Sequence, residues 1–540
     1  MRKKDKIACQ ILFSNFCIEN TLLSKVFYFL KTTNDIPNMN TIHKDNKEEY
    51  QDDSNTNPAV SSGPQHSIAS HTRAIRGLAT LRLLSPTVAF ALVSFSLGEL
   101  GDGLNIFQGI YLVAIGWNEG SVGVALSLMG LTSLLVQTWA GDYVDKTTVD
   151  RRTFLVVASI VTAASAMAIM FVREGNQDHV LIFASKVIEG VASSFIGPCI
   201  AALTLATFGP DHFDKVMASN ILYGHIGSVI AAVLAGALSY FLYPNIKMCF
   251  LVIAFSALIA VIFIPFLPEG DPQMGRGFRG RALVDPDGNE IIDNNDNAGQ
   301  WYKESSQVAR EEAASDYSVV FSDTKTLVLC VTGFFFHFAN ANVLLVLGEL
   351  MGGDNDDGSV KKTAIPLIAT AIVTAQVTMA LTTYLGDYLT RLGFGRKILF
   401  LAALLSLPIR CFLIILWKDA SEVFLLSTQI FDGIGGGLFG LLHPYLVADI
   451  TFGTGRFNVV MGLSASCFGL GATLSNYLGQ HIVEYFGHVT SLSASLFLSF
   501  VPIVLFAAMM PETYGQRGQL AADIEIQKID KIVENEYVIA

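Results

Sequence analysis

Several ionisable residues of this chain lie inside long apolar stretches, where side chains of their kind are costly. Glu99 and Asp102 lie in one stretch, Lys186 and Glu189 in a second and Asp432 in a third. A charge at the centre of a bilayer costs about 2.5–3.5 kcal/mol, so a charge kept inside a membrane span is a candidate for solute binding or proton transfer. The chemistry that these residues indicate is the carriage of a solute or a proton.

The two acidic residues share their spacing with an amide, because Glu99, Asp102 and Asn105 recur every three residues. On a helix this spacing places them on one slowly drifting face. Two carboxylates one turn apart in a low dielectric repel each other, so at least one of them should bind a proton readily. We predict that Glu99 or Asp102 couples transport to protons. The alternative is a pair held by Lys186 or by a backbone group.

Lys186 and Glu189 also lie one turn apart, and two roles are open for them. They can form an ion pair within their own helix. Alternatively, Lys186 holds the anionic end of a solute, or exchanges partners with Glu99 or Asp102 during a transport cycle.

Two stretches in the second half of the chain place polar residues in an unusual background. His337 and Asn340 lie in or beside the aromatic run 334–338, and His337 is a candidate to bind solute or to titrate near neutral pH. Aromatic residues at this spacing also serve ordinary helix packing. Gln429 and Asp432 precede several glycines, which suit close packing or a moving helix.

The composition excludes several classes of function. A formal net charge of -12 argues against a nucleic acid partner. No P-loop pattern is present, so ATP is not the evident energy source. No metal-ligand pattern or nucleophile and base set stands apart from helix packing, so we predict no enzymatic activity and no cofactor. A gradient of protons or of solute should therefore drive the process.

Membrane-spanning helices must position these residues. With 51% hydrophobic and 15% charged residues and a mean hydropathy of +0.47, the 540-residue chain is too apolar for a soluble protein. A span needs about 20 residues. We expect twelve spans, at 84–114, 121–143, 153–173, 179–207, 216–242, 246–267, 326–352, 363–389, 397–417, 421–450, 457–484 and 488–510.

Polar segments flank and divide the spans. We expect a disordered tail at 1–83, a linker at 268–323 and a polar tail at 511–540, which leaves two groups of six spans at 84–267 and 324–510. Lys and Arg concentrate in the loops on the side of the termini. The positive-inside rule therefore predicts that both termini and the linker are cytoplasmic.

An internal repeat relates the two groups of spans. The segment 208–217 matches 452–461 at five positions in one register, and Gly141 and Gly386 open two similar charged loops. Parallel halves of six spans are typical of one large class of transporters, which bind solute between the halves near the midplane of the membrane.

The two charged loops are candidate gates. A glycine lets helices approach, an acid caps a helix N-terminus or pairs with a base, and a basic cluster holds the loop at a cytoplasmic surface. The residues that we expect to act in this way are Gly141, Asp145, Lys146, Arg151 and Arg152 in the first copy, and Gly386, Arg391, Gly393, Arg396 and Lys397 in the second.

These loops resemble the signature of the major facilitator superfamily, a pattern close to G-x-x-x-D-[RK]-x-G-[RK]-[RK]. The first copy lacks the loop glycine and has extra residues before its basic pair. The second has Thr390 in place of the acid and an insertion at 394–395. The run Lys186-x-x-Glu189-Gly190 is similar to the family's fourth-helix pattern R-x-x-Q-G, whereas the fifth-helix antiporter pattern is missing from 216–242.

The resemblance covers 84–510 and implies an all-α membrane fold of two pseudo-symmetric six-helix bundles. In this family the first helices of successive three-helix units line the central cavity. Most of the buried charges fall in those helices, and His225 and Arg410 are exceptions.

We therefore expect a monomeric, proton-coupled secondary transporter of the plasma membrane that carries a small solute by alternating access. A facilitative uniporter is the first alternative. The second is a membrane receptor or scaffold that signals through the linker and the tails without transport.

Overall fold

The computed structural model describes residues 84–98, 100, 104–147, 149–175, 177–242, 246–278, 314–352 and 364–517. All regular elements within these ranges are helices. The expected N-terminal tail, the linker residues 279–313 and the C-terminal residues beyond 517 lie outside the described residues.

The helices follow the two groups of spans. The first group holds α4 (Pro86–Leu97), α5 (Asn105–Ala114), α6 (Glu119–Lys146), α7 (Arg151–Met167), α8 (His179–Phe241) and α9 (Leu251–Phe263), with short 3₁₀ helices at Ala168–Phe171, Ile246–Phe250, Ile264–Phe266 and Met274–Arg276. The second group holds α11 (Tyr317–Phe321), α12 (Thr324–Gly352), α13 (Ala364–Arg391), α14 (Arg396–Trp417), α15 (Glu422–Ser427), α16 (Gln429–Ile450), α17 (Phe457–Phe486), α18 (His488–Leu498) and α19 (Phe500–Met509). Within the described ranges, nine helical stretches are long and apolar enough to cross a membrane.

The spans predicted at 179–207 and 216–242 are both helical and both lie within α8, which consists of two helices that meet at Gly209, and the loop expected between them is reduced to that one non-helical residue. Gly209 alone leaves the helical conformation, at φ 68° and ψ 174°. Pro210 follows it, and a proline disfavours the α region in the preceding residue, while glycine adopts a positive φ without steric cost. The two spans are therefore joined by a kink.

The span predicted at 84–114 contains two described helices rather than one. α4 ends at Leu97 and α5 begins at Asn105, with Leu104 at φ 56° between them. Glu99, Asp102 and the side chain of Asn105 lie outside the described residues. The shared face predicted for Glu99, Asp102 and Asn105 therefore stays a prediction.

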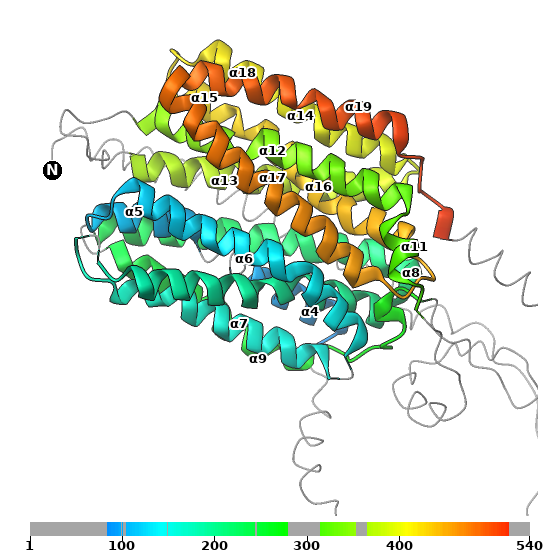
Figure 1. The fold of residues 1–540 in the computed structure, drawn as a ribbon. Coiled ribbons are helices and arrows are strands. Elements are labelled where there is room, and N and C mark those ends of the chain that lie inside the picture. The colour runs from blue at the N-terminus through cyan, green and yellow to red at the C-terminus, as the bar shows by residue number, and fades with distance from the viewer. Residues whose placement is uncertain are drawn as a thin grey trace, which may run out of the picture. The chain divides into compact units, whose positions relative to one another are not determined.

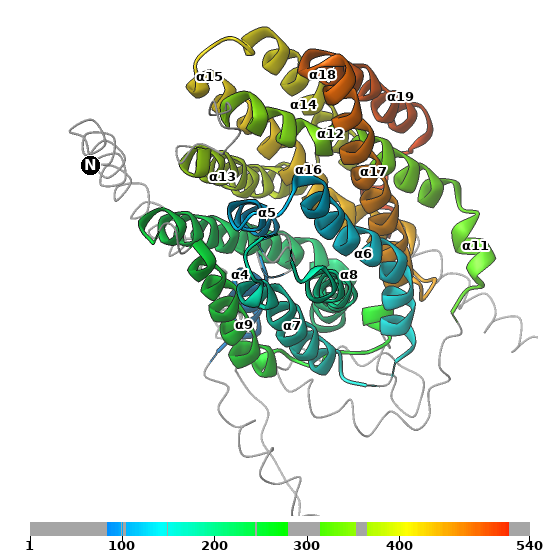
Figure 2. The ribbon, with the colours of Figure 1, turned by 60° about the vertical axis from the view of Figure 1, so that its left-hand side comes forward.

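The described helices bury two hydrophobic cores. One core is made by residues from α4 to α9. The other is made by residues from α11 to α19 and also includes a few residues of α8. Figures 1 and 2 show the same division, with α4, α7 and α9 on one side and α12, α14, α18 and α19 on the other. The chain therefore folds as two helical bundles.

The bundles meet through equivalent helices. α6 of the first bundle packs along α17 of the second, and α13 of the second packs along α8 of the first. The two contacts are equivalent, because α13 is the repeat partner of α6 and the second part of α8 is the repeat partner of α17. Phe213 and Phe457 occupy equivalent positions in the two repeats and are in direct contact. Their rings lie edge to face with centroids 5.6 Å apart. A residue meets its own repeat partner only near a twofold axis. The pseudo-twofold therefore passes between these two fully buried phenylalanines.

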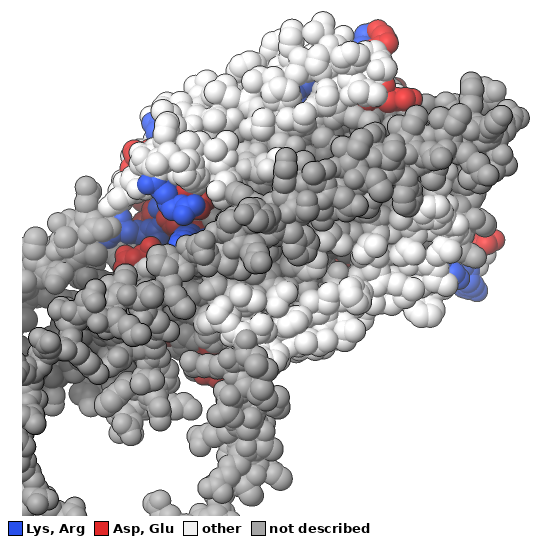
Figure 3. All heavy atoms as spheres, turned by 180° about the vertical axis from the view of Figure 1, so that it is seen from behind, with Lys and Arg blue, Asp and Glu red and all other residues white. Residues whose placement is uncertain are grey.

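The flank of the bundles is apolar. On the face in Figure 3, the charged side chains gather mainly at the ends of the molecule, and most of the described surface between them carries no charge. Large exposed side chains on this kind of surface include Trp139, Phe171 and Phe497, each more than 70% exposed. A surface of this kind is suited to contact with lipid.

Gly141 sets the distance between the bundles. A Cβ atom at this position would lie 2.0 Å from the carbonyl oxygen of Asn458 on α17. We predict that Gly141→Ala forces α6 and α17 apart and lowers the free energy of unfolding by about 1–3 kcal/mol. Thermal unfolding of the purified protein measures this loss.

The control is Gly123→Ala on the same helix, where a Cβ would meet nothing within 4 Å. This change should leave the melting temperature unchanged or raise it slightly, since alanine favours a helix. Equal melting temperatures for the two variants would contradict the close approach at Gly141.

Candidate functional site

The repeated segments meet at one end of the two bundles, which we call the loop end. Gly141 lies against the backbone of Asn458, Phe213 lies against Phe457, and Arg396 pairs with a residue of the first bundle. The loop end is formed by the segments 141–147, 149–152, 208–217, 386–397 and 452–461.

Asp145 closes the loop end by capping a helix of the opposite bundle. α17 begins at Phe457, and its own N-cap residue, Arg456, makes no side-chain capping bond. Asp145 accepts hydrogen bonds from the backbone N–H of Val459 at 3.0 Å and from Asn458 Nδ2 at 2.7 Å. A buried carboxylate here satisfies a free N–H of the first turn and lies at the positive end of the helix dipole.

Asp142 organises a second layer of contacts around the cap. Its carboxylate accepts a hydrogen bond from Tyr317 Oη at 2.5 Å and pairs with Lys146 Nζ at 2.7 Å. Arg456 of the second bundle lies 3.5 Å from the same carboxylate and covers the Tyr317 ring at 3.9 Å. α11, which follows the linker, is thereby tied to both bundles.

The equivalent point in the second copy is built differently. Asp214 holds the position in the first repeat that Asn458 holds in the second, so a carboxylate replaces the amide. Tyr445 Oη donates to the carbonyl of Asp214 at 2.6 Å and to Asp387 Oδ1 at 3.3 Å, and Arg391 pairs with Asp387 at 2.8 Å. Thr390 stands where Asp145 stands in the first copy, so the cap is not repeated here, and Tyr445 and Arg391 hold the two acids instead.

Four alternating charges, Asp214, Arg396, Asp449 and Arg517, complete this side of the loop end, and we call them the four-charge cluster. Arg396 lies 2.6 Å from each of the two acids, and Arg517 lies 2.5 Å from Asp214 and 2.6 Å from Asp449. Burial by itself lowers the pKa of Arg517, but the two carboxylates outweigh it and raise that pKa above its ordinary value. The segment after α19 thus binds both bundles.

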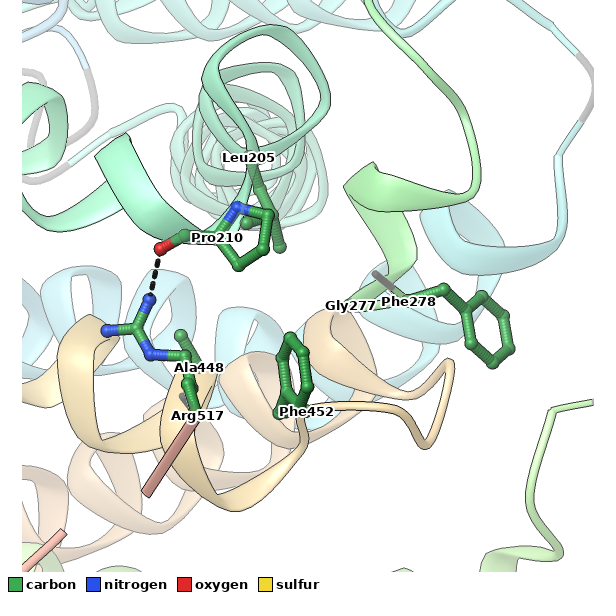
Figure 4. A pocket seen from close by; sticks show the side chains of 7 residues that line it. All are labelled: Leu205, Pro210, Gly277, Phe278, Ala448, Phe452 and Arg517. Carbon is green, nitrogen blue, oxygen red and sulfur yellow. Dashed lines mark hydrogen bonds between the residues drawn. The ribbon is translucent and has the colours of Figure 1, made fainter. Parts of the chain in front are cut away.

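A small cavity of about 10 Å³ lies beside the four-charge cluster. Figure 4 shows Arg517 donating to the Pro210 carbonyl, with Phe452 and Phe278 on the far side. Such a volume holds one water at most. The cavity is therefore part of the seam between the bundles and does not hold a solute.

The other predicted loop residues of the first copy hold the loop to its own bundle. Arg151 donates through Nη2 to the carbonyls of Val144 and Pro272 at 3.4 and 3.3 Å. Arg152 pairs with Asp150 at 2.6 Å and with Glu269 at 2.5 Å.

In the second copy, Gly386 packs against leucines of α16, where a Cβ would lie 2.8 Å from Leu438. Gly393 takes a φ of 90° at the turn between α13 and α14. The backbone N–H of Lys397 donates to Glu512, which caps α14.

In the interior of the first bundle, the described contacts include the ion pair within α8. Lys186 Nζ lies 2.9 Å from Glu189 Oε2, and both side chains are almost fully buried. Glu189 also lies 3.5 Å from Gln108 Nε2 on α5. The ion pair is one of the two alternatives that the spacing predicts, and the exchange of partners stays a prediction.

The interior of the second bundle contains a polar cluster that the sequence analysis found only in part. Asn340, Gln429 and Asp432 come together, and Arg410 of α14 joins all three. Arg410 Nη1 lies 2.7 Å from Asp432 Oδ1 and 2.8 Å from Asn340 Oδ1. Arg410 stands out in the sequence as a charge within an apolar span. It was not predicted as a site residue, because its span is not one of those expected to line the central cavity.

His337 lies in an aromatic cluster between α12, α16 and α17. Its ring stacks on Phe468 at 5.3 Å and meets Phe439 edge to face at 5.3 Å. His443 lies against the same Phe468 at 4.9 Å and bonds to Ser464 Oγ at 2.7 Å. The packing role of the aromatic run is evident here, while solute binding by His337 stays a prediction.

Comparison with known proteins identifies the fold. The model of the Major Facilitator Superfamily matches residues 84–373. Transporters of this family type from two strains of Mycobacterium tuberculosis, both described as uncharacterised, are 32% identical over 80% of this chain and 96% of their own length. The chain belongs to the major facilitator superfamily.

Solved structures of the superfamily share the architecture. The proton:xylose symporter XylE has a TM-score of 0.58 at 13% identity, over 80% of this chain and 98% of its own. The nucleoside transporter NupG has a TM-score of 0.51 at 14% identity, over 79% of this chain and 100% of its own. At these identities the likeness shows the fold alone.

One further polar contact crosses between the bundles, and it involves His225, which the sequence places outside the predicted site. His225 Nδ1 on α8 lies 2.7 Å from Gln376 Oε1 on α13. It joins the two helices about midway along their contact, between the loop end and the close approach of Gly236 to Ala369.

The four-charge cluster makes Arg517 a strong structural contact. Since Arg517 is largely buried and serves two acids, we predict that Arg517→Ala lowers the free energy of unfolding by about 3 kcal/mol. Arg391→Ala is the matched control, because Arg391 is half exposed and its single pair is worth less than about 1 kcal/mol. Chemical or thermal unfolding of both variants measures the difference, and equal losses would show that the cluster contributes no more than a surface pair.

Proposed function

We propose that this protein is a secondary active transporter that carries a small polar solute by alternating access and is driven by protons. The observation that carries the proposal is the closure of the loop end by Asp145, which reaches from one bundle to cap a helix of the other. A contact of this kind joins two bodies through a few directional hydrogen bonds. It can therefore break and re-form as the bundles rock.

Polar groups in the interior support the same function. Lys186 and Glu189 lie buried in the first bundle, and Arg410 and Asp432 lie in the second. Buried charges in a membrane protein are retained mainly where solute or protons pass. The neighbours XylE and NupG are named as carriers of a sugar and of a nucleoside, which agrees with a small polar solute for this chain.

The loop end should face the cytoplasm. It carries Lys146, Arg152, Arg391, Arg396 and Lys397, and basic residues concentrate on the cytoplasmic side of membrane proteins. In the proposed arrangement both termini lie on that side, the protein is a monomer of the plasma membrane, and the structure represents the state closed to the cytoplasm.

Uptake into liposomes tests proton coupling. The solute is first sought among metabolites whose levels differ between cells that lack and cells that overproduce the protein. We predict that an inward proton gradient increases uptake of that solute and that a protonophore removes the increase. Uptake unaffected by the protonophore would favour a uniporter, and no flux of any such metabolite would favour a receptor or scaffold.

Asp145 offers a direct test of the gate. We predict that Asp145→Ala removes about 1–2 kcal/mol of cap energy from the closed state, which lowers the ratio of closed to open protein roughly tenfold. Cysteines replacing Thr138 and Ser466, whose hydroxyl oxygens lie 3.1 Å apart across the bundles, report closure by their cross-linking yield.

The yield should fall in Asp145→Ala. It should stay unchanged in Asp419→Ala, which removes an exposed acid from a loop outside the loop end. An unchanged yield in Asp145→Ala would show that the cap does not hold the gate.

A further inference from the structure

Arg410 is a buried cation whose hydrogen-bonding capacity is only partly used. Its side chain is 1% exposed, and Nη1 donates to both Asp432 and Asn340. Nη2 reaches Gln429 Oε1 at 3.4 Å, and Nε has no hydrogen-bond partner among the described residues. A guanidinium presents five N–H donors in a planar fork that matches both oxygens of one acid. In the described contacts Asp432 engages that fork through a single oxygen, Oδ1.

Gln429 supplies a second unused donor at the same place. Its side chain is 1% exposed, and within the described part of the chain Nε2 has no acceptor. Buried donors are almost always bonded, so two open donors on adjoining side chains indicate an acceptor that belongs there.

The cluster is least enclosed at Asp432 and Asn340. The Asp432 side chain is 16% exposed and Asn340 is partly buried, whereas the Arg410 side chain is only 1% exposed. α12, α14 and α16, which carry the cluster, lie side by side in both ribbon views (Figures 1 and 2). An incoming group would meet Asp432 first and the guanidinium next.

A buried guanidinium needs a counter-charge in every state of the protein, because an unpaired charge in this environment is strongly unfavourable. In the described structure Asp432 supplies that charge. Only another anion can take its place.

We propose that Arg410 binds the acidic group of the transported solute, which displaces Asp432 from the guanidinium. The solute class is a small organic acid with a carboxylate or a phosphate, and its oxygens accept from the Arg410 fork and from Gln429 Nε2. This inference rests on the proposed transport function and names its substrate class.

The test is the melting temperature of the full chain in nanodiscs of phosphatidylcholine, a lipid without net charge, so that no anionic headgroup supplies the acid. The probes are matched pairs of an acid and a neutral compound: xylonate and xylose, glucuronate and glucose, and uridine monophosphate and uridine. At least one acid should raise the melting temperature more than its neutral partner. The sugar acids and the nucleotide separate a carboxylate preference from a phosphate preference, and added anionic lipid shows whether a headgroup competes.

The variants separate binding from a structural ion pair. Arg410→Gln should weaken acid binding by about tenfold or more, since it removes charged hydrogen bonds. Asp432→Asn removes the competing carboxylate and leaves Arg410 without its counter-charge. This variant should melt lower without acid, gain more from acid than the wild type and bind it about tenfold more tightly. A purely structural pair would give the lower melting temperature with no added response to acid.

Two further variants complete the design. The double variant R410Q/D432N carries no net change in charge, so it should fold even where a single variant does not. Because it lacks the guanidinium, its melting temperature should not respond to acid. R173Q/D178N is the matched control, because it neutralises a pair outside the cluster that includes an exposed arginine, and it should respond to acid as the wild type does.

The inference is wrong if no acid of the panel stabilises the wild type more than its neutral partner, if R410Q/D432N keeps the response, or if Asp432→Asn gains nothing from acid. The proposed transport function is tested separately by uptake. Proton-driven uptake of a neutral solute with no effect of any acid would leave that function standing and refute this inference.

Discussion

The structure depends on a carboxylate of one bundle that completes a helix of the other. Asp145 satisfies the first turn of α17, whose own N-cap residue makes no capping bond. A helix start without a cap leaves N–H groups unsatisfied, so each bundle is incomplete at this point without its partner. Because such a cap is worth only about 0.5–2 kcal/mol, it favours closure without making it permanent. A carrier needs contacts of this strength between its moving parts.

The two repeats differ at one position beside the pseudo-twofold axis, and this difference explains why the two sides of the loop end are held together differently. Phe213 and Phe457 meet at the axis, yet the residue that follows each of them differs: Asp214 in one copy and Asn458 in the other. The amide supports a simple cap, whereas the carboxylate requires the arginines of the four-charge cluster. One side of the loop end is therefore held by hydrogen bonds and the other by ion pairs, and the ion pairs recruit the segment after α19.

The sequence predicts the class of fold and the repeat well, because hydropathy and self-similarity are local signals. The fold of two bundles and the membership of the superfamily are confirmed. The break between α4 and α5 was missed, because apolar composition alone does not show where a helix stops. The spans at 179–207 and 216–242 were separated at the right place, but the connection between them is shorter than expected, and Gly209-Pro210 was the signal for it. Tyr317, Arg410 and Arg517 were missed as partners, since each contacts residues far away in the chain. The roles assigned to Glu99 and Asp102 stay predictions, as both lie outside the described residues.

The central claim is that closure at the loop end and opening at the other end are one motion. Spin labels at Val149 and Leu392, both exposed near the loop end, and at Glu174 and Asp419, both exposed in other loops, measure it by double electron–electron resonance. In Asp145→Ala the account predicts that the first distance lengthens while the second shortens. A first distance that lengthens while the second stays fixed would show a local latch and contradict alternating access.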